Sequence, residues 1–256
     1  MAAVLPGCGV RQDAGAARPP AGVSALAEQA YRAPPAITSA SRGAGGRVIL
    51  AGLADPGARI RAATPAGQAV VARADRRGFW RIALPGAGEL RLLGLSMSQG
   101  ARTIQAQGYL AVTPEGEVAQ LRAGAGALVV AGPGGAVRIL AVDVDRQGGA
   151  VVSGVGAPGG SVTLIVDGVA RGAARVDAGR RFVLALNEPL TPGDHRLEVD
   201  QGAARVEAAV SVSPPAPLTD GPFRAQRLAA GWRIDWLTPG GGLQSTLIFA
   251  RGGPQI

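Results

Sequence analysis

The chain has 256 residues and little of what a catalytic or metal site requires. It holds one cysteine, Cys8, and one histidine, His195. These counts exclude an internal disulfide, a multi-cysteine zinc site and any site built on two histidines. Aromatic residues make up only 4 % of the chain, and no apolar run approaches the roughly 20 residues of a membrane-spanning helix. We therefore expect no metal, no cofactor and no catalytic residues.

Lysine is also missing, so all 26 basic residues are arginine, and the net charge is +8. An excess of this kind can attract nucleic acid or another polyanion. The densest group, Arg73, Arg76, Arg77 and Arg81, is not interleaved with aromatic residues as a single-strand binder requires. No nucleic-acid partner is expected, and an anionic lipid or polymer is the favoured class among anionic partners.

The N-terminus contains Leu5-Pro-Gly-Cys8, which resembles the lipobox of bacterial lipoproteins, where a signal peptide is cut before a lipidated cysteine. Seven residues are too few for a basic region and an apolar region upstream. Either the true start lies further upstream, or Cys8 is an ordinary thiol. Residues 9–36 are rich in alanine, proline and glycine, as in a flexible tether.

An internal repeat is the strongest signal in the chain. Residues 37–84 align with residues 139–186 at a constant offset of 102. The alignment matches turn residues and apolar positions: Ile37 with Ile139, Gly46 with Gly148, Gly52 with Gly154, Ile60 with Val162, Asp75 with Asp177, and Trp80 with Phe182.

Each repeat has the pattern of short antiparallel strands. Pro56-Gly57 and Pro158-Gly159 suit type II turns, because proline presets the first central dihedral and glycine accepts a positive φ at the second. Strand-like runs recur with turn signals between them, which indicates a β-sandwich. We expect one large aromatic residue in each repeat, Trp80 or Phe182, to fill the space between two sheets.

These motifs resemble the bacterial immunoglobulin-like (Ig-like) repeat of envelope and surface proteins. Gly52 to Ile60 matches its Gly-x-Ala-x-Pro-Gly pattern, Gly154 to Val162 fits it through Pro158-Gly159, and Asp75-Arg-Arg-Gly-Phe-Trp-Arg-Ile matches its second motif. The second repeat departs more, with Arg180-Arg181-Phe182. The resemblance implies tandem sandwiches that serve as spacers or interaction modules, and it carries over no catalytic residue.

The expected fold is all-β: two tandem Ig-like β-sandwiches followed by a C-terminal β-hairpin. The domain boundaries that we predict are a lipobox-like start and tether over 1–36, a first sandwich over 37–125, a second over 126–213, and a proline-rich linker with the hairpin over 214–256. The segment Glu117–Leu140 can form its own hairpin or donate strands to either sandwich.

The predicted hairpin places Trp232, Ile234 and Trp236 on one face, with Arg233 and Asp235 on the other. Two tryptophans at this spacing could stack on sugar rings or anchor a protein partner. Alternatively, they pack the hairpin onto the second sandwich, because an isolated hairpin is marginal in water.

Few other residues are candidates for chemistry. His195 follows Asp194 directly, so the two side chains should point to opposite faces of a strand, and we expect a structural or solvated histidine. Asp143 and Asp145 lie on one strand face, where a solvated face is favoured over a calcium site shared with Asp200.

The sequence thus predicts a non-enzymatic spacer or protein-interaction module of the periplasm or cell envelope, with Cys8 as a possible site of lipidation. Its expected partners are envelope proteins or a cell-wall polymer, and it would meet a membrane only through the lipid. The alternative is a module that binds peptidoglycan or another polysaccharide through Trp232 and Trp236. A hydrolase acting through His195 is disfavoured.

Overall fold

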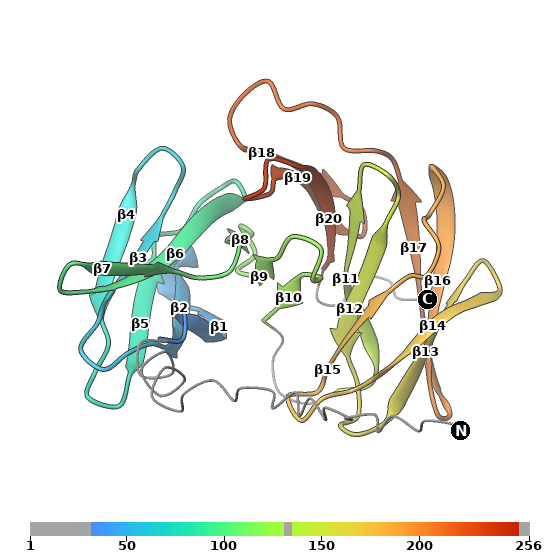
Figure 1. Ribbon diagram of the computed structural model, residues 1–256, viewed down its shortest axis with the longest axis horizontal. Coiled ribbons are helices and arrows are strands. Elements are labelled where there is room, and N and C mark those ends of the chain that lie inside the picture. The colour runs from blue at the N-terminus through green and yellow to red at the C-terminus, as the bar shows by residue number, and fades with distance from the viewer. Residues whose placement is uncertain (1–31, 131–134, 251–256) are drawn as a thin grey trace, which may run out of the picture. The chain divides into compact units, whose positions relative to one another are not determined.

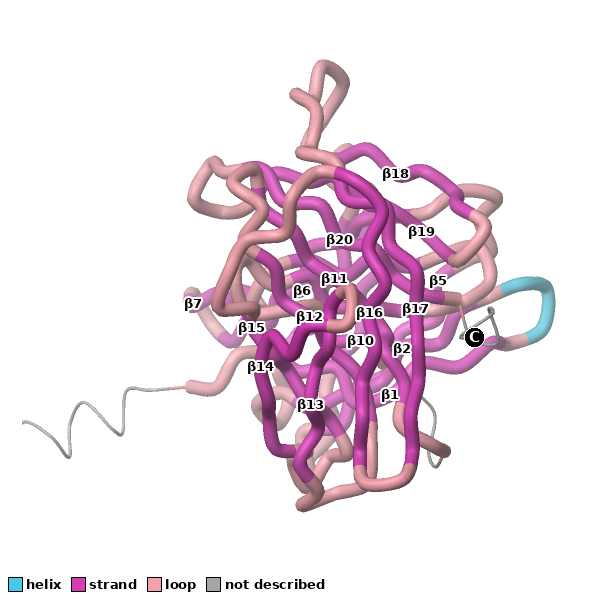
Figure 2. Tube along the Cα trace, turned by 90° about the vertical axis from the view of Figure 1, so that its right-hand side faces the viewer, coloured by secondary structure: helices cyan, strands magenta, loops and turns pink. Residues whose placement is uncertain are grey.

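The computed structural model describes residues 32–130 and 135–250. The chain divides into two compact units between Ala33 and Pro34, and nearly all described residues belong to the second unit. They form strands β1 to β20 and a single short 3-10 helix, η1 (Ala44–Gly46), as Figure 2 shows. The all-β prediction is confirmed. No helix in the described parts of the chain has the length and apolar character needed to cross a bilayer.

The first repeat contains seven strands in two sheets. Their bounds are β1 (Ala36–Arg42), β2 (Val48–Leu53), β3 (Arg59–Ala63), β4 (Ala69–Arg73), β5 (Phe79–Leu84), β6 (Arg91–Gln99) and β7 (Arg102–Gln105). One sheet has the order β1-β2-β5, and β4, β3, β6 and β7 lie in the other. Leu50, Ile60 and Trp80 are among the buried residues that form the core between the sheets.

The second repeat has the same strand sequence. Its strands are β11 (Arg138–Asp145), β12 (Ala150–Val155), β13 (Ser161–Val166), β14 (Val169–Arg175), β15 (Arg181–Ala185), β16 (Gly193–Gln201) and β17 (Ala204–Val212). Six of the seven begin 102 residues after their counterparts, so the offset seen over residues 37–84 also holds for β6 and β7. The irregularity in the pairing of β1 with β2, between Ile37 and Ser39, recurs between Ile139 and Ala141.

Close packing explains the repeated glycine and aromatic pair. Gly52 is paired with Trp80 across β2 and β5, and Gly154 with Phe182 across β12 and β15. A Cβ on Gly52 would lie 2.5 Å from the Trp80 ring and 1.9 Å from the Ala36 carbonyl oxygen. Both rings are buried in the cores, so the prediction that they fill the space between the sheets agrees with the structure.

The repeated aspartate closes the turn before β5 or β15. The Asp75 carboxylate accepts hydrogen bonds from the backbone N–H groups of Arg77 and Phe79. Asp177 accepts the equivalent bond from Arg181 N–H at 2.8 Å. Such local bonds favour the turn over a continued strand.

After β7 the first repeat departs from the second. Whereas β17 pairs with β16 along its whole length, β7 pairs with only one half of β6, and β8 (Tyr109–Val112) pairs with the other half. The sheet then continues through β9 (Val118–Leu121) and β10 (Leu128–Val129). Part of the ambiguous segment Glu117–Leu140 is therefore donated to the first repeat, and its last residues start β11.

The C-terminal strands extend a sheet of the second repeat. The predicted hairpin is present as β19 (Gly231–Leu237) and β20 (Leu243–Phe249), joined by β18 (Phe223–Leu228). Because β20 also pairs with β11, the hairpin continues the sheet in the order β15-β12-β11-β20-β19-β18, as can be followed in Figure 1.

Candidate functional site

A third buried cluster lies where the extensions of the two repeats meet. It combines apolar residues of β6, β8, β9 and β10 with residues of β11, β12, β19 and β20, and we call it the joint. Its buried members are Leu90, Leu92, Ala111, Ala119, Leu121, Ala127, Val129, Leu140, Ala141, Val155, Ile234, Trp236 and Ile248. Each repeat also has its own core, so the joint is an additional apolar contact between them.

Trp236 is a central packing residue of the joint. Its side chain is completely buried, and its indole N–H donates to Thr246 Oγ1 at 3.0 Å. The Tyr109 ring of β8 meets it edge-on, with the ring centroids 5.9 Å apart. A sugar ring therefore cannot reach Trp236 in this arrangement, and the structure gives this predicted ligand-binding residue a packing role.

Trp232 is half-buried and also bonds to the first repeat. Its indole N–H donates to Glu115 Oε2 at 3.1 Å, and the Arg227 guanidinium lies over its ring. Arg227 pairs with the same carboxylate at 2.9 Å. The pKa of Glu115 is lowered by hydrogen bonds from its own backbone, from Trp232 and from Thr113, and by the Arg227 charge, which together outweigh its partial burial. Ligand binding by Trp232 remains a prediction.

Asp143 ties a loop of the first repeat to the second-repeat sheet. Its carboxylate is buried and accepts hydrogen bonds from Ala127 N–H at 2.6 Å, Gln244 Nε2 at 2.8 Å and Thr246 Oγ1 at 2.5 Å. Ser153 Oγ donates to the Ala127 carbonyl oxygen at 2.7 Å. The expectation of a solvated Asp143 is wrong, because β20 and the loop before β10 cover this face of β11.

Burial raises the pKa of Asp143 to about 6, because desolvation penalises the charged carboxylate. The three hydrogen bonds and the Arg122 charge act in the opposite direction and limit this rise in the pKa. Arg122 itself donates to the carbonyl oxygens of Gly126 and Ala125, both at 2.9 Å. The loop from Arg122 to Ala127 is thus held by polar bonds as well as by the apolar contact.

Asp235 lies on the face of β19 opposite Trp236, where it is the centre of a second polar cluster. It accepts hydrogen bonds from Ser245 Oγ at 2.5 Å, Arg224 at 2.6 Å and Arg233 at 2.9 Å. Burial alone would raise its pKa, but these bonds lower it overall. Arg233 also donates to the Ser213 carbonyl oxygen at 2.9 Å, which fixes the chain leaving β17 against the added strands.

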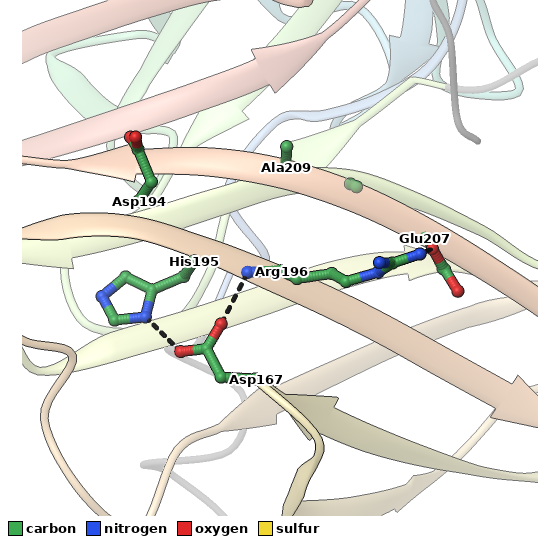
Figure 3. A pocket seen from close by; sticks show the side chains of 7 residues that line it. Asp167, Asp194, His195, Arg196, Glu207 and Ala209 are labelled. Atoms are coloured by element: carbon green, nitrogen blue, oxygen red, sulfur yellow. Dashed lines mark hydrogen bonds and ion pairs between the residues drawn. The ribbon is translucent and has the colours of Figure 1, made fainter.

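His195 lines a surface pocket and is engaged at both ring nitrogens. Nδ1 lies 2.7 Å from Asp167 Oδ2, and Nε2 lies 2.8 Å from the Thr191 carbonyl oxygen. In Figure 3, Asp194 points away from the His195 ring, as the alternation of side chains along the strand predicts. A neutral imidazole has one N–H, so only the imidazolium satisfies both acceptors.

The charged form of His195 is accordingly favoured. The bond to the Thr191 carbonyl and then the bond to Asp167 raise the pKa of the ring. An imidazole held in this way has no free nitrogen to act as a base. His195 therefore serves in this pocket as a positively charged structural residue. Sequence reasoning missed Asp167, although Asp167-Gly168 has the composition of a tight hairpin turn. Asp167 is at φ +50° there, and it also accepts from Arg196 N–H.

The remaining candidates have local partners. Asp145 accepts hydrogen bonds from the N–H groups of Gln147 and Gly149, and Asp200 pairs with Arg205 at 2.8 Å. Within residues 32–130 and 135–250, no three acidic, histidine or cysteine side chains gather as a metal site would require. Cys8 and most of the predicted tether lie outside the described residues.

Comparison with known proteins finds only distant structural neighbours. No protein-family model matches the chain, and no curated protein matches it. Among solved structures, the BSP domain of a biofilm-associated protein has 13 % sequence identity and a TM-score of 0.25, and the match covers 72 % of this chain. This chain spans only 30 % of that protein. The central fibronectin-III array of RIM-binding protein also has 13 % identity and a TM-score of 0.25, over 85 % of this chain and 89 % of that one.

Proposed function

We propose that this chain is a non-enzymatic spacer and protein-interaction module of the cell envelope, in which the joint holds two Ig-like repeats as one rigid body. The observation that carries this proposal is the joint itself. Contacts between domains usually permit relative motion unless they are large and hydrophobic. Here both repeats add strands beyond their own sandwiches, and these strands meet in a buried apolar cluster.

Polar contacts support rigidity because they require one alignment of the two repeats. Asp143 and Gln244 bind the backbone N–H groups of Ala127 and Gly124, respectively. Buried hydrogen bonds have narrow geometric tolerance, and a donor that loses its partner there costs about 1–3 kcal/mol. A rotation of one repeat against the other would break several of these bonds together.

The non-enzymatic assignment is supported by the state of the one histidine. Both ring nitrogens of His195 face acceptors, and the nearby Arg196 pairs with Glu207. Trp236 has no exposed face, so sugars cannot stack between Trp232 and Trp236 in this arrangement.

Placement in the envelope rests on Cys8 and the tether-like composition after it. The test is the intact mass and N-terminal sequence of the protein purified from its native cells. We expect a mature chain that starts at a lipid-modified Cys8. An unmodified chain that starts at Met1 or Ala2 would remove the lipoprotein assignment and leave the joint unaffected.

The rigid arrangement is tested by calorimetry. Repeats that share a core should unfold in one transition. When one repeat unfolds, the apolar residues that the other contributes to the joint become exposed to water, which destabilises that repeat as well. The variant Trp236→Ala opens the joint and should split the transition into two. Two transitions in the unmodified protein, at temperatures that the substitution does not change, would contradict the proposal.

A further inference from the structure

The outward face of β3, β4, β6 and β7 in the first repeat is positively charged and has no acidic residue. Alternation along the strands places Arg59 and Arg61 of β3 and Arg73 of β4 on this face, since Ile60, Ala62 and Ala72 point to the core. The neighbouring positions on β6 and β7 are Ser98, Thr103 and Gln105, together with Ser96, which is buried. We call this surface the arginine face.

The arginines of this face are not neutralised. Arg59 lies directly opposite Arg73 in the pairing of β3 with β4, an arrangement that is destabilising for like charges. All three arginines are exposed. In the described parts of the chain none of them pairs with a carboxylate, and Arg73 donates only to the Gly57 carbonyl oxygen.

The corresponding face of the second repeat, 102 residues later in the chain, provides an internal comparison, because its arginine charge is paired with carboxylates. Arg59 and Arg61 correspond to Ser161 and Thr163, and Ser96 and Ser98 correspond to Glu198 and Asp200. On that face Arg205 pairs with Asp200 at 2.8 Å and with Glu198 at 3.3 Å. The fold therefore does not require uncompensated arginines at these positions.

We propose that the arginine face binds a linear polysaccharide that carries carboxylate groups. A guanidinium binds a carboxylate through two parallel hydrogen bonds, and the arginines of adjacent strands present several such groups on one surface. The hydroxyl and amide groups of Ser98, Thr103 and Gln105 lie beside them as hydrogen-bonding partners for sugar hydroxyls.

The composition of the face disfavours the other polyanions. It has no aromatic side chain on which the bases of a single strand could stack, and a broad sheet face does not enter a groove of duplex DNA as a helix or two-stranded ribbon does. Val71 is the one large apolar residue of this face among the exposed ones described, whereas peripheral binding to a membrane needs a larger buried apolar surface.

The test measures binding of the full chain to polygalacturonate at low and high salt, with neutral dextran as a control polymer. We expect binding to polygalacturonate alone, weakening as salt screens the charges. The variant Arg59→Ser/Arg61→Thr takes the residues of the second repeat and should bind roughly tenfold more weakly or worse. Its folding should be intact, because the opposed arginine pair is removed.

A matched control removes the same charge elsewhere. Arg47→Ser/Arg81→Thr changes two exposed arginines outside the arginine face and should alter affinity less than about threefold. Equal weakening by both variants overturns the proposal, as does tighter binding to duplex DNA or to phosphatidylglycerol vesicles than to polygalacturonate. Either result leaves the rigid joint intact, since calorimetry tests it separately.

Discussion

At the scale of single residues, the buried carboxyl group of Asp143 makes the stability of the protein depend on pH. Its pKa of about 6 in the folded protein lies above its ordinary value of 3.8. The folded state therefore binds a proton more tightly than the unfolded state between these values. The contribution of Asp143 to the free energy of unfolding falls as the pH rises through this window.

The first prediction follows from this sign. Between pH 4 and pH 6, the stability of the unmodified protein should decrease relative to that of Asp143→Asn, by at most about 3 kcal/mol. Urea unfolding of both proteins at several pH values measures the difference. A difference that does not change with pH, or that changes in the opposite direction, would show that the carboxyl group is not buried as described.

The second prediction concerns His195, whose pKa is raised in the folded state. The stabilisation is complete below the unfolded pKa and is lost as the pH rises through the folded pKa. Because Asp167 is half-exposed, the loss should be below about 1 kcal/mol. His195→Gln should be less stable than the unmodified protein at pH 5.5 and nearly equal to it at pH 9. A constant deficit would mean that packing, not charge, is lost.

At the scale of elements, the geometry that the two repeats share depends on glycines packed against aromatic rings. A Cβ on Gly154 would lie 2.4 Å from the Phe182 ring and 2.2 Å from the Arg138 carbonyl oxygen, and the distances at Gly52 are similar. Neither contact can be relieved by a flexible side chain. The strand pairs β1–β2 and β11–β12 therefore require glycine there.

The third prediction compares two glycine substitutions of different kinds. Gly52→Ala should destabilise the protein by more than about 3 kcal/mol, because the methyl group overlaps backbone and ring. Gly57→Ala, at φ +73° with open space around it, should cost only about 1 kcal/mol through its backbone conformation. Denaturant midpoints measure both, and similar costs at the two positions would refute the packing argument.

The sequence predicted those parts of the fold that depend on local signals. The Pro-Gly turns, Asp75 and Asp177, and the spacing of Trp80 and Phe182 each specify a turn or a core position within a few residues. The pairing of β20 with β11 is a contact across about 100 residues of chain, and no local pattern contains it. For the same reason Asp143 resembled a solvated strand residue, and Asp167 gave no sign that it would reach His195.

At the scale of the whole second unit, the two repeats differ in where they add strands. The first extends the sheet that contains β6, and the second extends the sheet that contains β11. The two extensions provide the apolar residues of the joint. A tandem array of identical sandwiches would lack this contact, so the departures from the repeat are the features that join the repeats.

The fourth prediction is the energetic weight of Trp236 in this contact. Trp236→Ala should lower the free energy of the first unfolding step by about 3–5 kcal/mol, the range for removing a large buried side chain, as urea unfolding would measure. Tyr109→Phe keeps the edge-on ring contact and serves as the matched control, with an expected loss below about 1 kcal/mol. Equal losses for the two variants would contradict a packing role centred on Trp236.

The most direct test of the rigid joint is the distribution of distances between spin labels in the two repeats. With Cys8→Ser, labels are placed at Ala83→Cys on β5 and Ala173→Cys on β14, both exposed positions. A pair at Ala173 and Ala209, within the second repeat, gives the width due to the labels themselves. We predict one distribution between the repeats that is as narrow as this reference and that broadens when Trp236 is replaced by alanine. A broad distribution between the repeats of the otherwise unmodified protein would contradict it.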